Sequence, residues 1–384
     1  MRRSVRVSPT VGALAAVLLL AGSGALPRRS GVSVARAANT HAAAARPGSS
    51  FLSLWQPQAG SSKIVLEAFS LHDGRALRTL EALPRWPSEV SSPHPGSGGS
   101  VWITVNSGPR YRNDTAGGDP APNSCTSTVF SFDPATGKTV TRLSFPRSAL
   151  VSDGVPSPDG ERIVMDAGGC TTAYFNQHLL VKDLRSGRAP TIGTDAANCH
   201  ALSSAGWAAD GSKLVFAYGP ASASPPGQQP PAGTCTVPHP SGLAVVSATR
   251  SSQLAAMALI APTPGCTYQS AAFDRRGIVG IEACAQGTPR QPGGAVPGVY
   301  LGDAYLVQLD SRGRPLLRLA LKLGSNRGTV VADAGTGLVL VSEDQAQGRR
   351  HTTYDWVWTF DGWQLKTVGR YPFEGNAVVT AEPW

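Results

Sequence analysis

The chain has 384 residues, with 34 Lys and Arg against 25 Asp and Glu, and a formal net charge of +9. Six arginines and no acidic residue fall within residues 1–37, so the remaining residues carry only +3. This small excess, without a basic stripe that includes aromatic residues, argues against nucleic-acid binding. The 43 Gly and 31 Pro are typical of an all-β chain with many turns.

The first residues have the features of a secretory signal peptide. A basic start is followed by an apolar run at residues 11–21 and by an A-x-A cleavage motif at residues 35–37. The apolar run is shorter than the about 20 residues that a membrane-spanning helix needs. Ser23 stands where a lipoprotein would carry its lipidated cysteine. We therefore predict export with cleavage, and a retained leader that anchors the chain is the alternative.

After the leader, one hairpin pattern recurs. Each copy is an apolar strand, a turn rich in Asp, Gly or Ser, and a second strand. The six copies occupy residues 64–80, 129–145, 179–193, 243–259, 305–321 and 357–371. Their turns, at positions 74, 137, 187, 250, 313 and 362, are 49 to 63 residues apart. A period of this length indicates a repeat architecture.

The second copy contains the sequence DPATGKT at residues 133–139, which ends like a nucleotide-binding P-loop. A P-loop also needs a glycine at position 132 and a helix after the lysine, because consecutive backbone N–H groups must surround the phosphates. Phe132 occupies that position, and the residues after Thr139 alternate like a strand. We predict a turn between two antiparallel strands and no nucleotide site.

A second hairpin pattern lies between the copies of the first. It comprises a short strand, a Pro/Asp/Gly turn and a strongly apolar strand, at residues 155–168, 206–219, 271–284 and 330–343, with a degenerate copy at residues 88–105. The two hairpins together supply four antiparallel strands, which is the composition of one propeller blade.

The turn Ser157-Pro158-Asp159-Gly160, followed by an apolar strand, resembles the repeats of TolB-like and WD40-like β-propellers found in secreted bacterial proteins. The resemblance covers roughly residues 50–384. It implies a propeller scaffold of a kind that serves in binding, in assembly and in some enzymes, so the family alone does not define the function.

The two ends of the repeat region complement each other. Residues 51–80 supply three strands, and residues 375–380 supply one lone strand. We therefore predict an all-β, six-bladed β-propeller of four-stranded antiparallel blades, closed by one C-terminal strand that joins three N-terminal strands. The predicted organisation is a signal peptide (1–37), a flexible Ala/Pro/Ser segment (38–50) and a single β-propeller domain (51–384).

Six cysteines in an exported chain predict three disulfides. They are Cys125, Cys170, Cys199, Cys235, Cys266 and Cys284. In the blade arrangement all six fall on one face of the disc. Because the start of the first strand of a blade lies beside the end of the second, we expect the pairs Cys266–Cys284 and Cys199–Cys235, which leaves Cys125–Cys170. No C-x-x-C and no paired histidines occur, so the sequence predicts no metal site.

The face that carries the cysteines also carries the long loops, at residues 107–127, 169–178, 219–241 and 285–303. Long loops on a rigid scaffold are frequent binding sites. The residues that precede or begin the six first strands should line the mouth of the central channel, and they are Trp86, Asp153, His200, Tyr268, Arg327 and Glu374. This mixture suits a small polar ligand or a peptide side chain. The alternative is that these residues only cap strand ends and bind water.

Enzyme motifs are absent from the sequence, which has neither a G-x-S-x-G nucleophile elbow nor an H-E-x-x-H zinc motif. We predict a monomeric, exported, non-catalytic binding or scaffold module in the cell envelope or outside the cell, with no cofactor and no catalytic residues. Its partner would be an envelope or extracellular protein or a small polar ligand. The alternatives are a channel enzyme of the lactonase or sugar-dehydrogenase type and a subunit of an envelope assembly.

Overall fold

The computed structural model describes residues 50–55, 64–83, 93–107, 126–133, 135–145, 149–169, 178–194, 200–202, 205–220, 241–253, 256–285, 302–321, 328–333, 338–347, 352–371 and 379–382. All of them belong to one compact unit, residues 44–384. The described residues are almost entirely strands and turns, with a short 3₁₀ helix at Ser97–Gly99. In these parts of the chain, no helix is long and apolar enough to span a membrane.

Three sheets are built mainly from strands of the N-terminal half, and the strands of each sheet are given from the innermost outwards. Sheet 1 contains β26 (Val379–Glu382), β1 (Ser50–Trp55), β2 (Ile64–Ser70) and β3 (Ala76–Leu83). Sheet 2 contains β4 (His94–Pro95), β5 (Val101–Ser107), β6 (Thr126–Asp133) and β7 (Lys138–Phe145). Sheet 3 contains β8 (Ala149–Pro156), β9 (Arg162–Gly169), β10 (His178–Asp183), β11 (Thr191–Thr194) and β16 (Ser252–Gln253).

The C-terminal half forms three more sheets. Sheet 4 contains β12 (His200–Leu202) and β13 (Gly206–Trp207), both paired with β14 (Lys213–Pro220), and then β15 (Gly242–Ser247) and β17 (Leu259–Ile260). Sheet 5 contains β18 (Cys266–Asp274), β19 (Gly277–Ala285), β20 (Gly302–Leu309) and β21 (Pro315–Leu321). Sheet 6 contains β22 (Gly328–Asp333), β23 (Leu338–Gln347), β24 (Thr352–Phe360) and β25 (Leu365–Tyr371).

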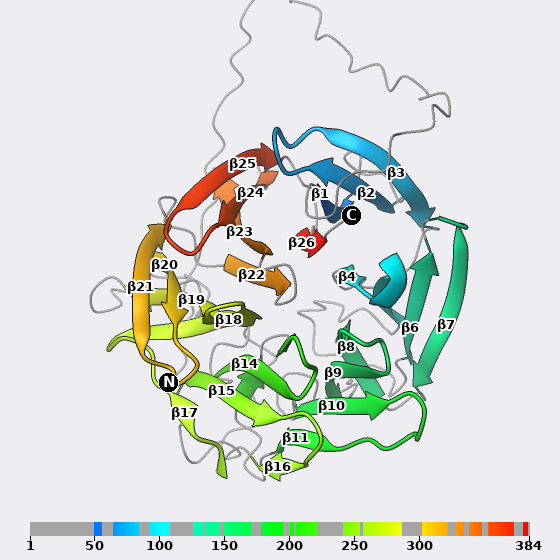
Figure 1. Ribbon diagram of the computed structural model, residues 1–384, viewed down its shortest axis with the longest axis horizontal. Helices are drawn as coiled ribbons and strands as arrows, with labels where there is room; N and C mark the ends of the chain where they lie inside the picture. Colours follow the sequence, from blue (N-terminus) through cyan, green and yellow to red (C-terminus); the bar gives the residue numbers. More distant parts are fainter. Residues whose placement is uncertain are drawn as a thin grey trace, which may run out of the picture. The chain divides into compact units, whose positions relative to one another are not determined.

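Neighbouring sheets contact one another around a ring (Figure 1). Strand β4 contacts β8, β14 contacts β18, β18 contacts β22, and β26 contacts both β22 and β4. Sheets 3 and 4 share a hydrophobic cluster, and the Trp207 indole donates a 3.0 Å hydrogen bond to the Val155 carbonyl between them. The predicted all-β propeller fold is therefore confirmed.

The first and last described strands pair with each other. Residues Ser50 to Ser53 of β1 lie antiparallel to Val379–Glu382 of β26. The described strand β26 overlaps the predicted stretch, residues 375–380, at residues 379 and 380 and continues to Glu382, whereas residues 375–378 lie outside the described residues. This pairing gives β1 a hydrogen-bonding partner on its inner side, so that the edge of sheet 1 is not left open there.

The prediction of four strands in every blade is wrong for sheets 3 and 4. The sequence predicted one hairpin over residues 243–259, but after β15 the chain first pairs in parallel with β11 of sheet 3, where Ile192 lies opposite Ser252. The Thr191 N–H also donates to the Ser251 hydroxyl at 3.2 Å. Only afterwards does β17 pair with β15. The outer edge of β11 offers unpaired backbone groups, and this polar segment satisfies some of them.

The core lies between neighbouring sheets, as β14 illustrates. Its residues Leu214, Phe216 and Tyr218 pack in the cluster shared with sheet 3. The alternate residues Val215 and Ala217 pack in the cluster shared with sheet 5. Because successive side chains of a strand point to opposite faces, a strand buried on both faces is apolar throughout.

The short hairpin turns are held by aspartate side chains. In the turn between β6 and β7, Asp133 accepts hydrogen bonds from the Ala135 N–H at 2.9 Å and from the Thr136 hydroxyl at 2.7 Å. Gly137 follows with φ of 71° and needs the conformational freedom of glycine. The stretch that ends like a P-loop is therefore a turn between antiparallel strands, as predicted.

Candidate functional site

The structure describes the side chains of two of the six predicted channel residues. Asp153 and Tyr268 lie on β8 and β18, the innermost strands of sheets 3 and 5. His200 begins β12, but its side chain lies outside the described part. The other three, Trp86, Arg327 and Glu374, lie outside the described residues. The binding role of all six stays a prediction.

Asp153 does not precede its strand, as the sequence suggested, but lies in the middle of β8 at a bulge. The register between β8 and β9 shifts from Ser152 opposite Asp166 to Val155 opposite Val164. Among the described residues, Asp153 is the non-glycine residue with a positive φ, at 52°. A left-handed backbone costs about 1–2 kcal/mol for most residues and less for Asp. Bulges and such strained residues are frequent at functional sites.

Gly154 holds this bulge against sheet 2. Its backbone N–H donates to the Thr104 hydroxyl at 2.9 Å. A Cβ at this position would lie 2.8 Å from the Thr104 Oγ1 and 2.9 Å from the Ile163 Cδ1. Only glycine permits so close an approach, which fixes the position of Asp153 beside it.

The Asp153 carboxylate contacts the His94 imidazole of sheet 2 through Oδ1 and Nε2. The two side chains are 15% and 8% exposed, so the contact lies almost wholly within the wall formed by β4 and β8. Nothing in the sequence singles out His94, because it lies in the degenerate repeat copy. A carboxylate beside an imidazole can orient the ring, and together they can accept or donate a proton.

Tyr268 packs into the wall between sheets 4 and 5. Its side chain belongs to the hydrophobic cluster of these sheets and lies opposite Glu282 in the strand register. Burial raises the pKa of Tyr268 to about 12, and the Glu282 carboxylate contributes to this increase. The phenol therefore stays protonated at neutral pH and can act as a hydrogen-bond donor.

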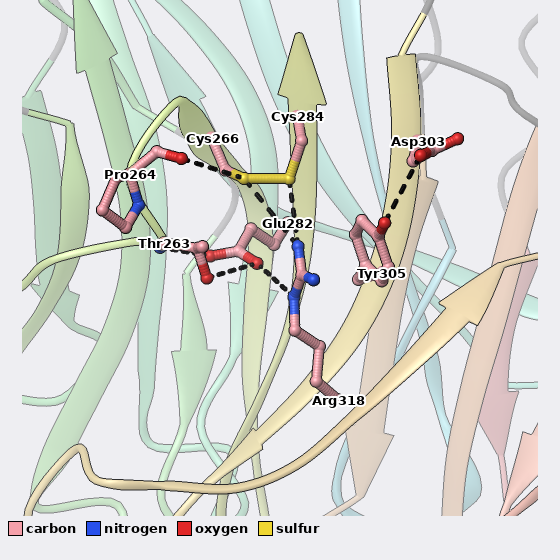
Figure 2. The surroundings of a disulfide bond; sticks show 8 residues. All are labelled: Thr263, Pro264, Cys266, Glu282, Cys284, Asp303, Tyr305 and Arg318. Atoms are coloured by element: carbon pink, nitrogen blue, oxygen red, sulfur yellow. Dashed lines mark hydrogen bonds and ion pairs between the residues drawn. A yellow bond between two sulfur atoms is a disulfide. The ribbon is translucent and has the colours of Figure 1, made fainter. Parts of the chain in front are cut away.

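The predicted Cys266–Cys284 disulfide is present. The two residues lie directly opposite each other on β18 and β19. Figure 2 shows the polar side chains that surround the bond. The predicted pairs of Cys125 with Cys170 and of Cys199 with Cys235 lie outside the described residues.

A buried carboxylate lies next to this disulfide. Glu282 is 1% exposed and accepts three hydrogen bonds: from the Thr263 N–H at 2.6 Å, from the Thr263 hydroxyl at 3.1 Å and from the Arg318 Nε at 2.9 Å. Thr263 follows β17 of sheet 4, and Arg318 lies on β21 of sheet 5. The carboxylate thus connects two sheets with full hydrogen bonding, as a buried charge requires. In the sequence, the signal for this buried carboxylate is that Glu282 is the one acid in the otherwise apolar stretch of β19.

Arg318 extends this network to the disulfide. Its Nη2 donates to the Cys284 Sγ at 3.1 Å and to the Cys266 Sγ at 3.8 Å (Figure 2). Its guanidinium carbon lies 3.3 Å from the centroid of the Tyr305 ring. The Arg318 side chain is 36% exposed. One cation, fixed by a carboxylate and an aromatic ring, therefore reaches both sulfurs and the solvent.

In the described parts, one group of side chains is spaced like a metal site: Cys266, Glu282 and Cys284, whose ligand atoms lie within 4.8 Å of one another. Both sulfurs are bonded to each other, so they do not offer the thiolates that metal ions bind. Arg318 also places a positive charge on the carboxylate. In its oxidised form this group does not fit a metal ion.

Comparison with known proteins identifies the fold. No protein-family model and no curated protein sequence matches the chain. Its structure is similar to that of TolB from Acinetobacter baumannii, with a TM-score of 0.51 and 12% identity over 88% of this chain and 67% of that chain.

Two further solved structures are similar with lower scores. The β-propeller domain of the trilobed protease from Pyrococcus furiosus has a TM-score of 0.38 and 12% identity, over 73% of this chain and 70% of that chain. An oligogalacturonate lyase in complex with manganese has a TM-score of 0.44 and 12% identity, over 80% and 74%. At these identities the TolB likeness shows a TolB-like propeller fold alone, so the function must be argued from the residues.

Proposed function

We propose that the chain is an exported, non-catalytic β-propeller whose central channel binds a small polar ligand or a side chain of an envelope or extracellular protein. In this proposal each of the six sheets is one blade of a monomer. The predicted signal peptide supports export, and the Cys266–Cys284 disulfide is consistent with an oxidising compartment outside the cytoplasm. The TolB-like fold is compatible with a binding role.

The observation that carries the proposal is the backbone conformation of Asp153. A left-handed aspartate in an inner strand persists only where the surrounding structure enforces it, and Gly154 and Thr104 do so at this bulge. This arrangement holds a carboxylate at the inner edge of sheets 2 and 3, beside the His94 ring. An ammonium, a guanidinium or another hydrogen-bond donor of a ligand is the chemical group that such a carboxylate accepts best.

The remaining predicted channel residues would surround this anchor. Trp86, Arg327 and Glu374 precede inner strands in the sequence, His200 begins β12 and Tyr268 is the third residue of β18. We propose that these five residues determine which ligand is accepted. A ring of mixed charges and aromatic side chains recognises polar groups by position, since each blade contributes one side chain.

The test compares capture of partners by variants of the full chain. The immobilised protein is incubated with an envelope extract of the producing cell, and the bound proteins are identified by mass spectrometry. We expect Asp153→Asn and His94→Gln to lose the partners that the wild type retains, while circular dichroism shows that both variants remain folded at the temperature of the capture. Asp133→Asn is the matched control, because Asp133 lies in a hairpin turn. Unchanged capture by the Asp153 and His94 variants would contradict the proposal.

The contact between His94 and Asp153 also supports a second function, that of a channel enzyme of the lactonase or sugar-dehydrogenase type. A carboxylate that orients an imidazole can prepare it as a general base. The purified chain would then hydrolyse lactones or oxidise sugars when supplied with calcium or a quinone cofactor, and His94→Gln would abolish turnover. Turnover that persists in His94→Gln would mean that the contact between His94 and Asp153 has no role in catalysis.

A further inference from the structure

We propose that the Cys266–Cys284 disulfide is a thiol-exchange site, at which an external thiol forms a mixed disulfide with Cys284 and Arg318 stabilises the Cys266 thiolate that is released. The inference does not depend on the ligand of the channel. It assigns a modification site to the end of β19 in sheet 5.

Exposure determines which sulfur is attacked. Cys266 is 9% exposed, whereas Cys284 is partly exposed at the end of β19 that leads into residues 286–301. An external thiol therefore reaches the Cys284 sulfur more readily. The partly exposed Arg318 guanidinium beside this sulfur also attracts an anionic thiolate.

The exchange proceeds in two balanced steps. The external thiolate attacks the Cys284 Sγ, a new S–S bond forms, and the electron pair of the old bond passes to the Cys266 Sγ. If the reagent is a dithiol, its second thiolate attacks the first sulfur of the same reagent, which is now bonded to the Cys284 Sγ, and releases the Cys284 thiolate. The dithiol is thereby oxidised to a disulfide, the protein disulfide receives two electrons, and the protons of the dithiol pass to the solvent or to the released thiolates.

Arg318 is positioned for both released thiolates. Its Nη2 lies 3.8 Å from the Cys266 Sγ and 3.1 Å from the Cys284 Sγ, while its Nε is bound to Glu282. The Glu282 carboxylate offsets part of the positive charge, but two hydrogen bonds from Thr263 also stabilise that carboxylate. The guanidinium therefore keeps donors directed at the sulfurs, and no rearrangement is required when the negative charge appears.

The opened bond leaves the sheet intact. Strands β18 and β19 pair from Cys266 opposite Cys284 to Asp274 opposite Gly277, and the backbone ladder does not depend on the cross-link. Exchange would thus change the chemistry of this edge of sheet 5 in a protein that stays folded. The reduced form would present two thiols and a guanidinium in place of a neutral disulfide.

The magnitude follows from leaving-group chemistry. A cation within hydrogen-bonding distance lowers the pKa of a neighbouring acid by about 1–3 units. If the leaving thiol has a Brønsted dependence near about 0.5, similar to that of the attacking thiol, loss of Arg318 should slow exchange by about 3- to 30-fold.

The test uses the full, oxidised chain with reduced glutathione, followed by alkylation of free thiols and peptide mapping under non-reducing conditions. We expect glutathione on Cys284 and the alkyl group on Cys266. Arg318→Met should slow the reaction by about 3- to 30-fold, and Arg318→Lys should retain most of the wild-type rate. Arg314→Met is the matched control on the same hairpin, because Arg314 binds Asp310 and no sulfur contact of Arg314 occurs in the described part.

Three results would overturn the inference. They are a glutathione adduct on Cys266, an Arg318→Met rate equal to or faster than that of Arg314→Met, and an absence of exchange until the chain is unfolded in urea. A faster rate in Arg318→Met would mean that the arginine only shields the bond.

Discussion

Replacing Arg318 with Met should lower the free energy of unfolding by about 2–3 kcal/mol. Removal of one partner from a fully buried ion pair costs about 3–5 kcal/mol, because the other charge is left without compensation. Glu282 is 1% exposed, but Arg318 is 36% exposed, and water already screens its side of the pair. The two hydrogen bonds from Thr263 persist in the variant, which places the loss below the fully buried value.

The stacking of Arg318 on Tyr305 adds to this loss. A cation over an aromatic ring at a partly exposed site contributes about 0.5–1 kcal/mol. We therefore expect about 2 kcal/mol from the ion pair and a smaller part from the ring contact. Met retains much of the aliphatic packing of the arginine stem, so the measured change reports mainly on the charge.

Urea unfolding followed by circular dichroism measures this change, with the disulfide kept oxidised in every sample. Glu282→Gln and the double variant complete a double-mutant cycle, which separates the interaction energy between Arg318 and Glu282 from the other effects of each substitution. We expect the double variant to be more stable than the sum of the single losses predicts, by about 1–2 kcal/mol. A loss below about 0.5 kcal/mol in Arg318→Met, or strict additivity in the cycle, would refute the argument that Arg318 compensates the buried carboxylate.

Three further predictions test the turns and the wall. Gly362→Ala should lower the free energy of unfolding by about 2 kcal/mol in thermal unfolding, since φ is 93° and a Cβ would displace the Arg276 side chain. Gly137→Ala should lower it by about 1 kcal/mol, because φ is 71° but no atom lies within 4 Å of the added Cβ. Hydrogen bonds lower the pKa of Asp133 in the folded chain, so the stability that its carboxylate contributes is present above the unfolded pKa and is lost as the pH falls below about 4. Asp133→Asn should therefore melt at a lower temperature than the wild type at pH 7, but at the same temperature at pH 2. The pKa of Tyr268 is raised to about 12 in the folded chain, so the free energy of unfolding decreases between pH 10 and 12, where the phenol ionises only in the unfolded chain. Tyr268→Phe should make this decrease smaller, and an absorbance titration of the variant should show one fewer tyrosine that ionises late.

Local chemistry explains why parts of the fold could be predicted from sequence. The turn after β6 follows from Asp133 and Gly137, which supply a side-chain acceptor and a left-handed backbone within five residues. The Cys266–Cys284 bond follows from antiparallel pairing, which places the start of one strand beside the end of the next. Both features depend on neighbours in the chain or within one hairpin.

The features that could not be predicted depend on contacts between sheets. Strand β16 consists of two polar residues, which are too few to show a strand periodicity, and its parallel partner β11 belongs to another repeat. A bulge inserts one residue into the alternation of β8, and the sequence alone does not show where Asp153 points. The two-residue strand β4 is too short for an alternation that would mark His94 as a wall residue.

Asp153 and Glu282 both lie inside strands, and their surroundings assign them different roles. A carboxylate within a strand between packed sheets is unfavourable unless it is paired, and both Asp153 and Glu282 contact a basic side chain of another strand. Glu282 is saturated by Thr263 and Arg318 on an ordinary strand backbone, which is how a structural connection between sheets is built. Asp153 is more exposed and lies in a left-handed bulge that an ion pair alone would not require. The difference in backbone, rather than in charge, is the reason to seek the binding site at sheets 2 and 3 and the structural brace at sheets 4 and 5.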